Sequence, residues 1–312
     1  MLTLARSYAQ VAAAPDALDA KPGVLNCANG TVDLDSGRFR PADPADLLTK
    51  QAAAPYDPAA PVPTWRAVLD TAFAGDPEMV DWFQRAVGYA AMGAPREHLL
   101  FVCYGTGANG KSTILGAIQD VLGDYARSLP VDALISHRGE FHPAATADLP
   151  GARFVVASEA NDGARLDEAV VKRLASTDRI TARRMHQDWF EFAPSHVIFL
   201  ATNHRPTVRG GDGGTARRLV LVPFTVTIPE DRRDPDLPAR LRGEAAGILA
   251  WVVAGVRAYR DRGLRDFPAA VRRATQDYLA ENDTPGLFLE DCTAAEARTT
   301  VKSAALYRAY RL

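Results

Sequence analysis

The segment from Gly105 to Ser112 constrains this chain more than any other part of the sequence. It fits the pattern G-x-x-x-x-G-K-[ST], follows an apolar run typical of a strand, and precedes a run with helical spacing. In such a turn, glycines let backbone N–H groups wrap around phosphates at the start of a helix. The segment therefore predicts a phosphate-binding loop, and the alternative is a glycine-rich turn that binds nothing.

Nine consecutive residues are the predicted nucleotide-binding set. They are Gly105, Thr106, Gly107, Ala108, Asn109, Gly110, Lys111, Ser112 and Thr113. We expect the Lys111 ammonium to reach the β- and γ-phosphates and the Ser112 hydroxyl to ligate Mg²⁺, so ATP is the expected substrate and Mg²⁺ the expected cofactor. Kinases, GTPases and motors share such a loop, so other residues must decide the function.

The middle of the chain predicts an α/β domain over residues 96–228. Its short apolar runs suit central strands of a covered sheet. These runs are Leu99–Tyr104, Phe154–Ala157, Val197–Ala201 and Leu219–Val222. Helical spacing over Ser112–Leu122 and Asp167–Ser176 alternates with them, which favours a central, largely parallel sheet.

Helical regions are expected on both sides of this domain. Residues 1–95 contain a turn-rich stretch, Asn26–Arg40, and one long helical stretch, Thr64–Met92. Residues 229–312 predict further helices. These are Leu237–Arg262, Ala269–Glu281 and a terminal helix over Leu306–Leu312, where the pattern suggests that a further module is cut.

Composition excludes some classes of protein. The formal net charge is −2, so any DNA contact must come from a local basic surface. The three cysteines lie far apart, which disfavours a zinc site or a disulfide framework and fits a reducing cytoplasm. No run of 18 apolar residues is present, so we expect no membrane segment.

Two polar residues at predicted strand ends are candidates for catalysis. Glu159 follows the run Phe154–Ser158, where a carboxylate could orient the attacking water and accept its proton. Asn203 follows the run ending in Thr202, where an amide could hydrogen-bond both the water and a γ-phosphate oxygen. The alternatives are an acidic residue leaving a strand and an Asx turn.

Two arginines and a predicted hairpin complete the candidate residues. Arg217 and Arg218 precede the strand at Leu219, and either could act as an arginine finger on a neighbouring subunit. We favour Arg218 because it adjoins the strand, and the alternative is a surface pair. Residues 180–192 predict a β-hairpin in which Arg183, Arg184 and His186 form a candidate DNA grip, or only a solvated turn.

These motifs together resemble the helicase portion of phage and plasmid primase–helicases, which belongs to superfamily three within the AAA+ group. The similar stretches run in the same order in both. They are 27–37, 87–90, Gly105–Thr113, 157–159, 172–174, 178–183, 201–206, Asp212 with Arg217 and Arg218, and 247–251. One departure from the family pattern is the absence of an aromatic residue before the arginine pair, where Ala216 stands. Ser158 also stands where many P-loop enzymes have an Asp that holds Mg²⁺ through water.

The resemblance implies an ATP hydrolase of AAA+ type that translocates 3′ to 5′ on single-stranded DNA as a hexameric ring. It also implies ATP sites between subunits, a primase domain or protein upstream, and action in the cytoplasm of a bacterial host. By the same resemblance Lys172 contacts phosphate or a neighbouring subunit, and we include it among the candidate DNA-binding residues. Two other functions stay open. One is a nucleotide-dependent loader or packaging scaffold without unwinding, and the other is a P-loop kinase for a small substrate.

Overall fold

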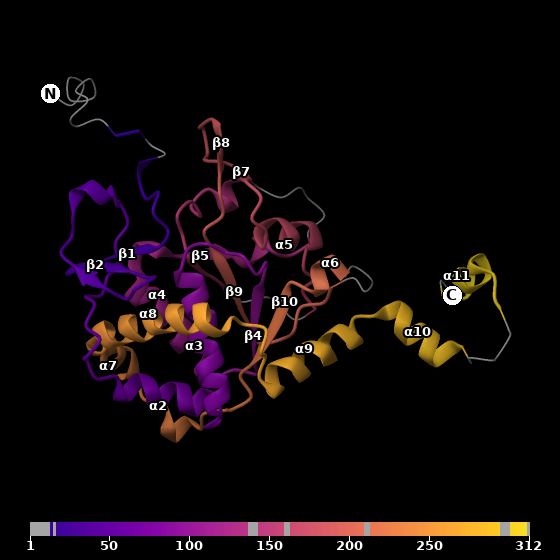
Figure 1. Cartoon of the computed structure of the whole chain (residues 1–312). Helices are drawn as coiled ribbons and strands as arrows, with labels where there is room; N and C mark the ends of the chain where they lie inside the picture. The colour runs from indigo at the N-terminus through magenta and orange to yellow at the C-terminus, as the bar shows by residue number, and fades with distance from the viewer. Residues whose placement is uncertain are drawn as a thin grey trace.

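The computed structural model describes residues 13–14, 17–136, 143–158, 163–208, 213–293 and 300–310, drawn in colour in Figure 1. Its strands are β1 Val24–Cys27, β2 Gly30–Asp33, β3 Phe39–Arg40, β4 Leu100–Tyr104, β5 Ala126–Pro130, β6 Phe154–Ser158, β7 Ile180–Arg183, β8 Trp189–Phe192, β9 Val197–Thr202 and β10 Leu219–Pro223. Its helices are α2 Pro63–Ala72, α3 Pro77–Ala91, α4 Lys111–Leu122, α5 Glu168–Leu174, α6 Gly213–Ala216, α7 Leu237–Gly243, α8 Ala245–Arg262, α9 Ala269–Glu281, α10 Thr284–Cys292 and α11 Ser303–Tyr310.

A five-stranded parallel sheet lies at the centre, in the order β10-β4-β9-β6-β5. Four of these strands confirm the predicted apolar runs. The edge strand β5 was not predicted, because its Arg127, Ser128 and Pro130 break the apolar pattern of a central strand. The predicted α/β class with a parallel sheet is confirmed.

Alternate residues of each central strand enter two separate cores, as the two-residue period of a strand requires. One core, which includes Phe101 and Phe199, lies between the sheet and helices α2, α3, α4 and α8. The other, which includes Val102 and Leu200, is covered by α5, the β7–β8 hairpin and part of α9. The sheet is therefore the middle of three layers (Figure 1).

The closest helix contact joins the predicted N-terminal and C-terminal regions. A Cβ on Gly88 of α3 would lie 2.0 Å from the carbonyl carbon of Gly255 in α8, and one on Gly255 would lie 2.3 Å from the Gln84 oxygen. Only glycine permits such an approach of two backbones. The two helical regions therefore pack as one layer and are not separate units.

Two predicted long helices are each divided in two. The stretch Thr64–Met92 breaks before Asp76, whose carboxylate caps α3 by accepting from the amides of Glu78 and Met79. The stretch Leu237–Arg262 breaks at Glu244, whose carboxylate accepts from the amides of Thr64 and Trp65 at the start of α2. Helical periodicity continues through both breaks, so it could not locate them.

Residues 1–95 also contain β1, β2 and β3, which form a small antiparallel sheet in the stretch predicted to be turn-rich. The buried Arg153 ties this sheet to the core. Its guanidinium donates to the Val24 oxygen at 2.8 Å and the Ala91 oxygen at 2.9 Å, and it lies 4.4 Å from the centroid of the Tyr125 ring. The N-terminal region therefore contains a small sheet in addition to the helices α2 and α3.

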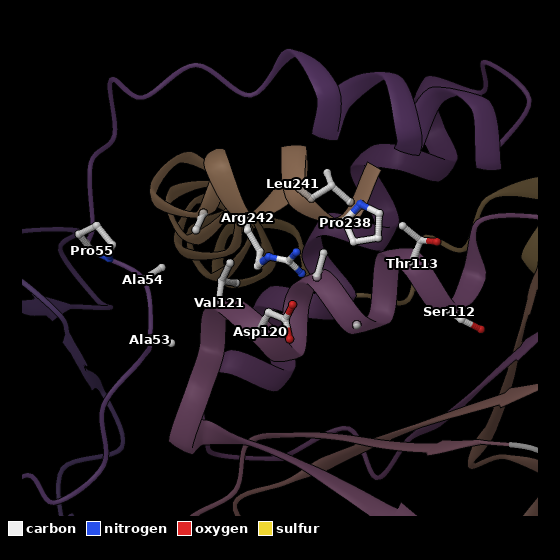
Figure 2. Close-up of a pocket in the computed structure, with 13 residues that line it drawn as sticks. Ala53, Ala54, Pro55, Ser112, Thr113, Asp120, Val121, Pro238, Leu241 and Arg242 are labelled. Carbon is white, nitrogen blue, oxygen red and sulfur yellow. The ribbon is translucent and has the colours of Figure 1, made fainter. Parts of the chain in front are cut away.

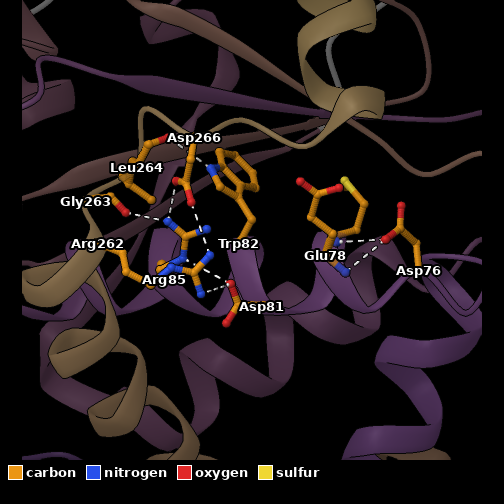
Figure 3. Close-up of polar contacts among 10 residues, drawn as sticks. Asp76, Glu78, Asp81, Trp82, Arg85, Arg262, Gly263, Leu264 and Asp266 are labelled. Carbon is orange, nitrogen blue, oxygen red and sulfur yellow. Dashed lines mark hydrogen bonds and ion pairs between the residues drawn. The ribbon is translucent and has the colours of Figure 1, made fainter.

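A polar cluster fixes α3 against the turn between α8 and α9 (Figure 3). The buried Arg85 donates to the Gly263 oxygen and to the Asp266 carboxylate, both at 2.6 Å. Trp82 donates its indole N–H to the Leu264 oxygen at 3.1 Å. Because Arg85 is only 1% exposed, these partners compensate the cost of burying its charge.

From this turn α9 runs past β10, and α10 and α11 extend beyond the layered body (Figure 1). The helix α9 confirms the prediction over the same residues. The helix α11 overlaps the predicted terminal helix from Leu306 to Tyr310 and begins earlier, at Ser303, whereas the last two predicted residues lie outside the described part. Within the described part of the chain, no helix is both long and apolar enough to cross a membrane.

The buried His196, immediately before β9, gives a pH dependence that can be tested. Burial lowers the pKa of His196 to about 4, against 6.5 for an exposed histidine. The unfolded chain therefore binds an extra proton between these pH values, and the free energy of unfolding should fall as pH falls from 6.5 to 4. Each pKa unit is worth about 1.4 kcal/mol, so we expect His196 to account for roughly 3 kcal/mol of this loss. Denaturant melts of the wild type and His196→Gln over this range should show a shallower decline for the variant, and parallel curves would contradict the assignment.

Candidate nucleotide site

The candidate residues gather where the parallel strands end. Tyr104 of β4 pairs in register with Thr202 of β9, and Ala201 of β9 pairs with Ser158 of β6. The loop that follows β4 and the Asn203 that follows β9 therefore leave the same edge of the sheet side by side. The sequence placed these residues on separate strands, and the sheet order brings them together.

The backbone of the loop explains its glycines. Gly107 and Gly110 have φ values of 99° and 80°, in the region that glycine enters at little cost. A Cβ on Gly105 would lie 2.1 Å from the Phe224 oxygen, so any side chain there would displace the loop from the segment after β10.

Asn109 braces the loop from inside. Its side-chain nitrogen donates to the Phe224 oxygen at 3.3 Å, and its side-chain oxygen accepts from the Lys111 amide, also at 3.3 Å. The residue is only 3% exposed. Asn109 therefore supports the loop from beneath and leaves the N–H groups around it as the surface for a ligand.

The Lys111 ammonium lies at the centre of the site and joins the loop to the end of β9. It donates to the Thr202 oxygen at 2.6 Å, to the Gly105 oxygen at 3.2 Å and to the Asn203 side-chain oxygen at 3.3 Å. Burial lowers the pKa of Lys111. The structure thus places Lys111 and the side-chain amide of Asn203 in direct contact. The ammonium of Lys111 forms no ion pair with a carboxylate among the described residues.

Two cavities flank the first turn of α4. One, of about 920 Å³, lies between α4, the segment Ala53–Pro55 and α7, with Ser112 and Thr113 at one end (Figure 2). The other, of about 720 Å³, lies between α2 and the segment after β10, and Ala108, Gly110 and Thr113 are among the residues that line it. The Ser112 side chain is exposed, as a metal ligand at this turn must be.

Several predicted residues lie elsewhere or outside the described residues. Glu159 and Asp212 lie outside them, although Ser158 at the end of β6 shows where the strand before Glu159 stops. Lys172 lies half-buried in the last turn of α5, on the other face of the sheet from α4.

The two candidate finger arginines differ in exposure. Arg217 is exposed, whereas Arg218 is half-buried and donates a hydrogen bond to the Gly214 oxygen of α6. The Arg218 amide also donates to the Thr215 oxygen at 2.9 Å. Arg218 therefore stabilises the turn after α6 in this structure, and Arg217 is the one of the pair that extends into solvent.

The predicted hairpin is confirmed as β7 and β8, which pair antiparallel and project past the sheet (Figure 1). Its two arginines face opposite sides. Arg183 is paired with Trp189 on the exposed face, whereas Arg184 lies 5.9 Å from the Phe190 ring centroid and 4.0 Å from the Asp148 carboxylate. His186 sits at the tip with a φ of 60°.

The structure adds residues that the sequence did not single out. Arg205, two residues after Asn203, pairs with Glu281 of α9 at 2.9 Å and lies 5.7 Å from the centroid of the Tyr104 ring. Tyr278 of α9 donates its hydroxyl to the Pro206 oxygen at 2.5 Å. These contacts hold the loop after β9 against α9, and only the fold could show that α9 reaches it.

Comparison with known families matches two parts of the chain. Residues 1–74 match a family described as D5 N terminal like, and residues 103–218 match a family of unknown function, DUF5906. The second match contains the loop, the hairpin and both arginines.

Viral proteins are among the similar sequences. A provisionally named helicase of Acanthamoeba polyphaga mimivirus is 25% identical, and the alignment covers 88% of this chain and 31% of that protein. One of Invertebrate iridescent virus 6 is 23% identical, with 88% and 32% covered. A provisionally named primase of African swine fever virus is 26% identical, with 65% and 22% covered. The chain thus spans less than a third of these curated relatives.

A solved structure shares the fold. The C-terminal region of NrS-1, solved without ligand, superposes with a TM-score of 0.53 at 13% identity, covering 84% of this chain and 66% of that one.

The fold and the loop define an α/β protein of P-loop-like architecture. Its sequence matches support a relation to the phage-type primase–helicases: a D5 N terminal like family model matches residues 1–74, and the similar viral proteins carry helicase or primase names.

Proposed function

We propose that this chain is the ATP-driven motor of a replication helicase that moves on single-stranded DNA. The observation that carries the proposal is the contact of the Lys111 ammonium with Asn203 at the end of the sheet. A γ-phosphate bound at Lys111 would lie beside the Asn203 amide, so Asn203 would respond to the phosphate that Lys111 binds. The helicase names of the viral relatives support the same conclusion.

Each residue of the site has a role in this proposal. Lys111 exchanges its carbonyl partners for the β- and γ-phosphates, and Asn203 orients the attacking water. Glu159 accepts the proton of that water. Bound Mg²⁺ would be held by the Ser112 hydroxyl and would neutralise phosphate charge, and the exposure of this hydroxyl fits such a ligand.

The smaller cavity is the site we propose for the adenine base. Ala108, Gly110 and Thr113, beside which the nucleotide would leave the loop, are among its lining residues, and its volume of about 720 Å³ lies in the usual range for small ligands. Val68, Val226 and Ile228 give it an apolar part that suits a flat aromatic base, and the rest of its lining includes Arg232, Arg233, Asp234 and Arg240.

We further propose an AAA+ type ring, with a hexamer as the assembly and 3′-to-5′ movement along DNA. In the sheet order, the strand that leads to Asn203 lies between the loop strand β4 and the strand β6 that leads to Glu159. In such a ring a neighbouring subunit would supply the arginine finger. The exposure of Arg217 favours it over Arg218, which we assign to bracing α6.

The β7–β8 hairpin is the part that would grip DNA in the channel of the ring. Arg183 and Arg184 place positive charge at its end, where His186 lies at the tip, and Lys172 of α5 would add a phosphate contact behind it. Because the net charge of the chain is −2, such a local cluster is where phosphate contacts must form. A primase domain or protein completes the proposed replication machinery.

Substitutions at Lys111 and Glu159 should have different effects. Lys111→Ala removes the charge on the phosphates, so ATP hydrolysis should fall by roughly a hundredfold or more. Glu159→Gln keeps the shape but not the base, so ATP should still bind while turnover falls by a similar factor. Nucleotide binding and phosphate release should be measured with Glu78→Gln, an exposed carboxylate on α3, as the control. Wild-type turnover in Glu159→Gln would remove that carboxylate from the mechanism.

Mixing inactive variants tests whether an arginine acts in trans. Arg217→Ala and Lys111→Ala should each be inactive alone, yet mixed rings contain some interfaces with both an intact loop and an intact finger. Partial recovery of ATP hydrolysis on mixing is therefore expected, with Arg218→Ala tested in parallel. No recovery at any ratio for either arginine, in rings shown to be mixed, would contradict a finger in trans.

Replacing Arg183, Arg184 and His186 together with Ala should weaken binding of single-stranded DNA. If two or three phosphate contacts are lost, the plot of log affinity against log salt should flatten by about 1.4 to 2.1, since each contact contributes about 0.7. Anisotropy of a labelled oligonucleotide over a salt series measures this slope. An unchanged affinity and slope would exclude the hairpin as the grip and favour a loader or scaffold.

A further inference from the structure

The projecting β7–β8 hairpin exposes large apolar side chains next to its cations. Met185 is 73% exposed and Trp189 is 56% exposed, whereas Trp65 and Trp82 are fully buried. An indole in water on a projecting element contributes nothing to the core, so its presence there points to a contact outside the chain.

Arg183 holds this indole in place. The two residues lie opposite each other in the strand register, and the guanidinium carbon lies 5.6 Å from the Trp189 ring centroid. Arg183 also donates its Nε–H to the Gln187 oxygen at 2.8 Å, across the hairpin turn. The guanidinium is thus engaged with both the indole and the backbone, which makes Arg183 a support for Trp189 as well as a source of charge.

The neighbouring polar side chains suit a polyanion that also carries flat rings. Arg184 lies on the opposite face of the hairpin, with its guanidinium near Phe190, and His186 lies at the tip. Arginines beside an accessible aromatic face match the phosphates and unpaired bases of a single strand. A lipid surface or an apolar protein face would not need the guanidinium fixed beside the ring.

We propose that Trp189 is a stacking platform for an unpaired base of single-stranded nucleic acid, and that Arg183 positions its ring. The inference rests on the proposed function of the hairpin and adds to it a contact with bases, where the arginines contact phosphates. Because every base has an aromatic face, this platform would bind a single strand without regard to its sequence. Paired bases in a duplex hide those faces, so the platform would also favour single strands over duplex.

The test compares an oligo-dT strand with an abasic strand of the same length, which has the same phosphates but no bases. Wild-type protein should bind the oligo-dT strand more tightly. Trp189→Ala should weaken its binding roughly five- to a hundredfold, reduce the difference between the two strands, and leave the salt slope unchanged, because stacking releases no counterions. Arg184→Ala should instead flatten the slope by about 0.7 for both strands.

A second variant separates stacking from a change in folding. Trp189→Phe keeps an aromatic face and should retain most of the affinity. Oligo-dT should quench the tryptophan fluorescence of the wild type but not that of this variant. Tyr307→Ala, which removes another exposed aromatic side chain (60% exposed) on α11, should bind like the wild type. Melting temperatures should match in all variants, since Trp189 lies outside both cores.

Equal binding of the two strands by the wild type, or unchanged oligo-dT binding by Trp189→Ala, would overturn the platform while the electrostatic grip stands. If Trp189→Ala altered only self-association, the indole would be a contact between copies and the inference would be wrong. Failure of the wild type to bind either strand would reject the proposed function of the hairpin and the platform with it.

Discussion

The contact between the Lys111 ammonium and the end of β9 is the interaction on which the rest of the site depends. Its hydrogen bonds to Thr202 and Asn203 exist only because β4 and β9 are parallel neighbours in register. One cation thereby joins the loop to the residue proposed to sense its ligand. A phosphate that draws the ammonium away from these oxygens would alter the end of β9 directly, and this is the simplest route from ATP to the rest of the chain.

The loop after β9 is also in contact with α9. Arg205 and Pro206, which follow Asn203, are held by Glu281 and Tyr278 of that helix. The opposite face of the sheet is held rigidly by α3 and α8, whose backbones meet at Gly88 and are fixed further by Arg85. Fewer helices cover the sheet on the side of α9 and the hairpin. We therefore expect a movement at the site to displace these elements more than α3 and α8.

The sequence predicted the central strands, the loop and the hairpin because each depends on a local pattern. Buried strands are continuously apolar, and the loop has fixed spacing from Gly105 to Ser112. It could not predict β5, whose edge position tolerates Arg127 and Ser128, or the helix break at Glu244, which depends on contacts with the start of α2. The break before Asp76 has a local signal, because Gly75 is typical of a helix end and Asp76-Pro77 of a helix start, but helical periodicity alone passes over it. It also could not show that Arg218 folds onto α6, because that hydrogen bond comes from tertiary structure.

The central claim is that ATP hydrolysis at this loop serves movement on single-stranded DNA. Steady-state ATP turnover, measured at saturating ATP with and without an oligo-dT strand, tests it most directly. We expect the strand to raise the turnover several-fold, and duplex DNA of equal length to do so less. Turnover that is the same with and without the strand would contradict a motor, and turnover that requires a small phosphate acceptor would identify a kinase instead.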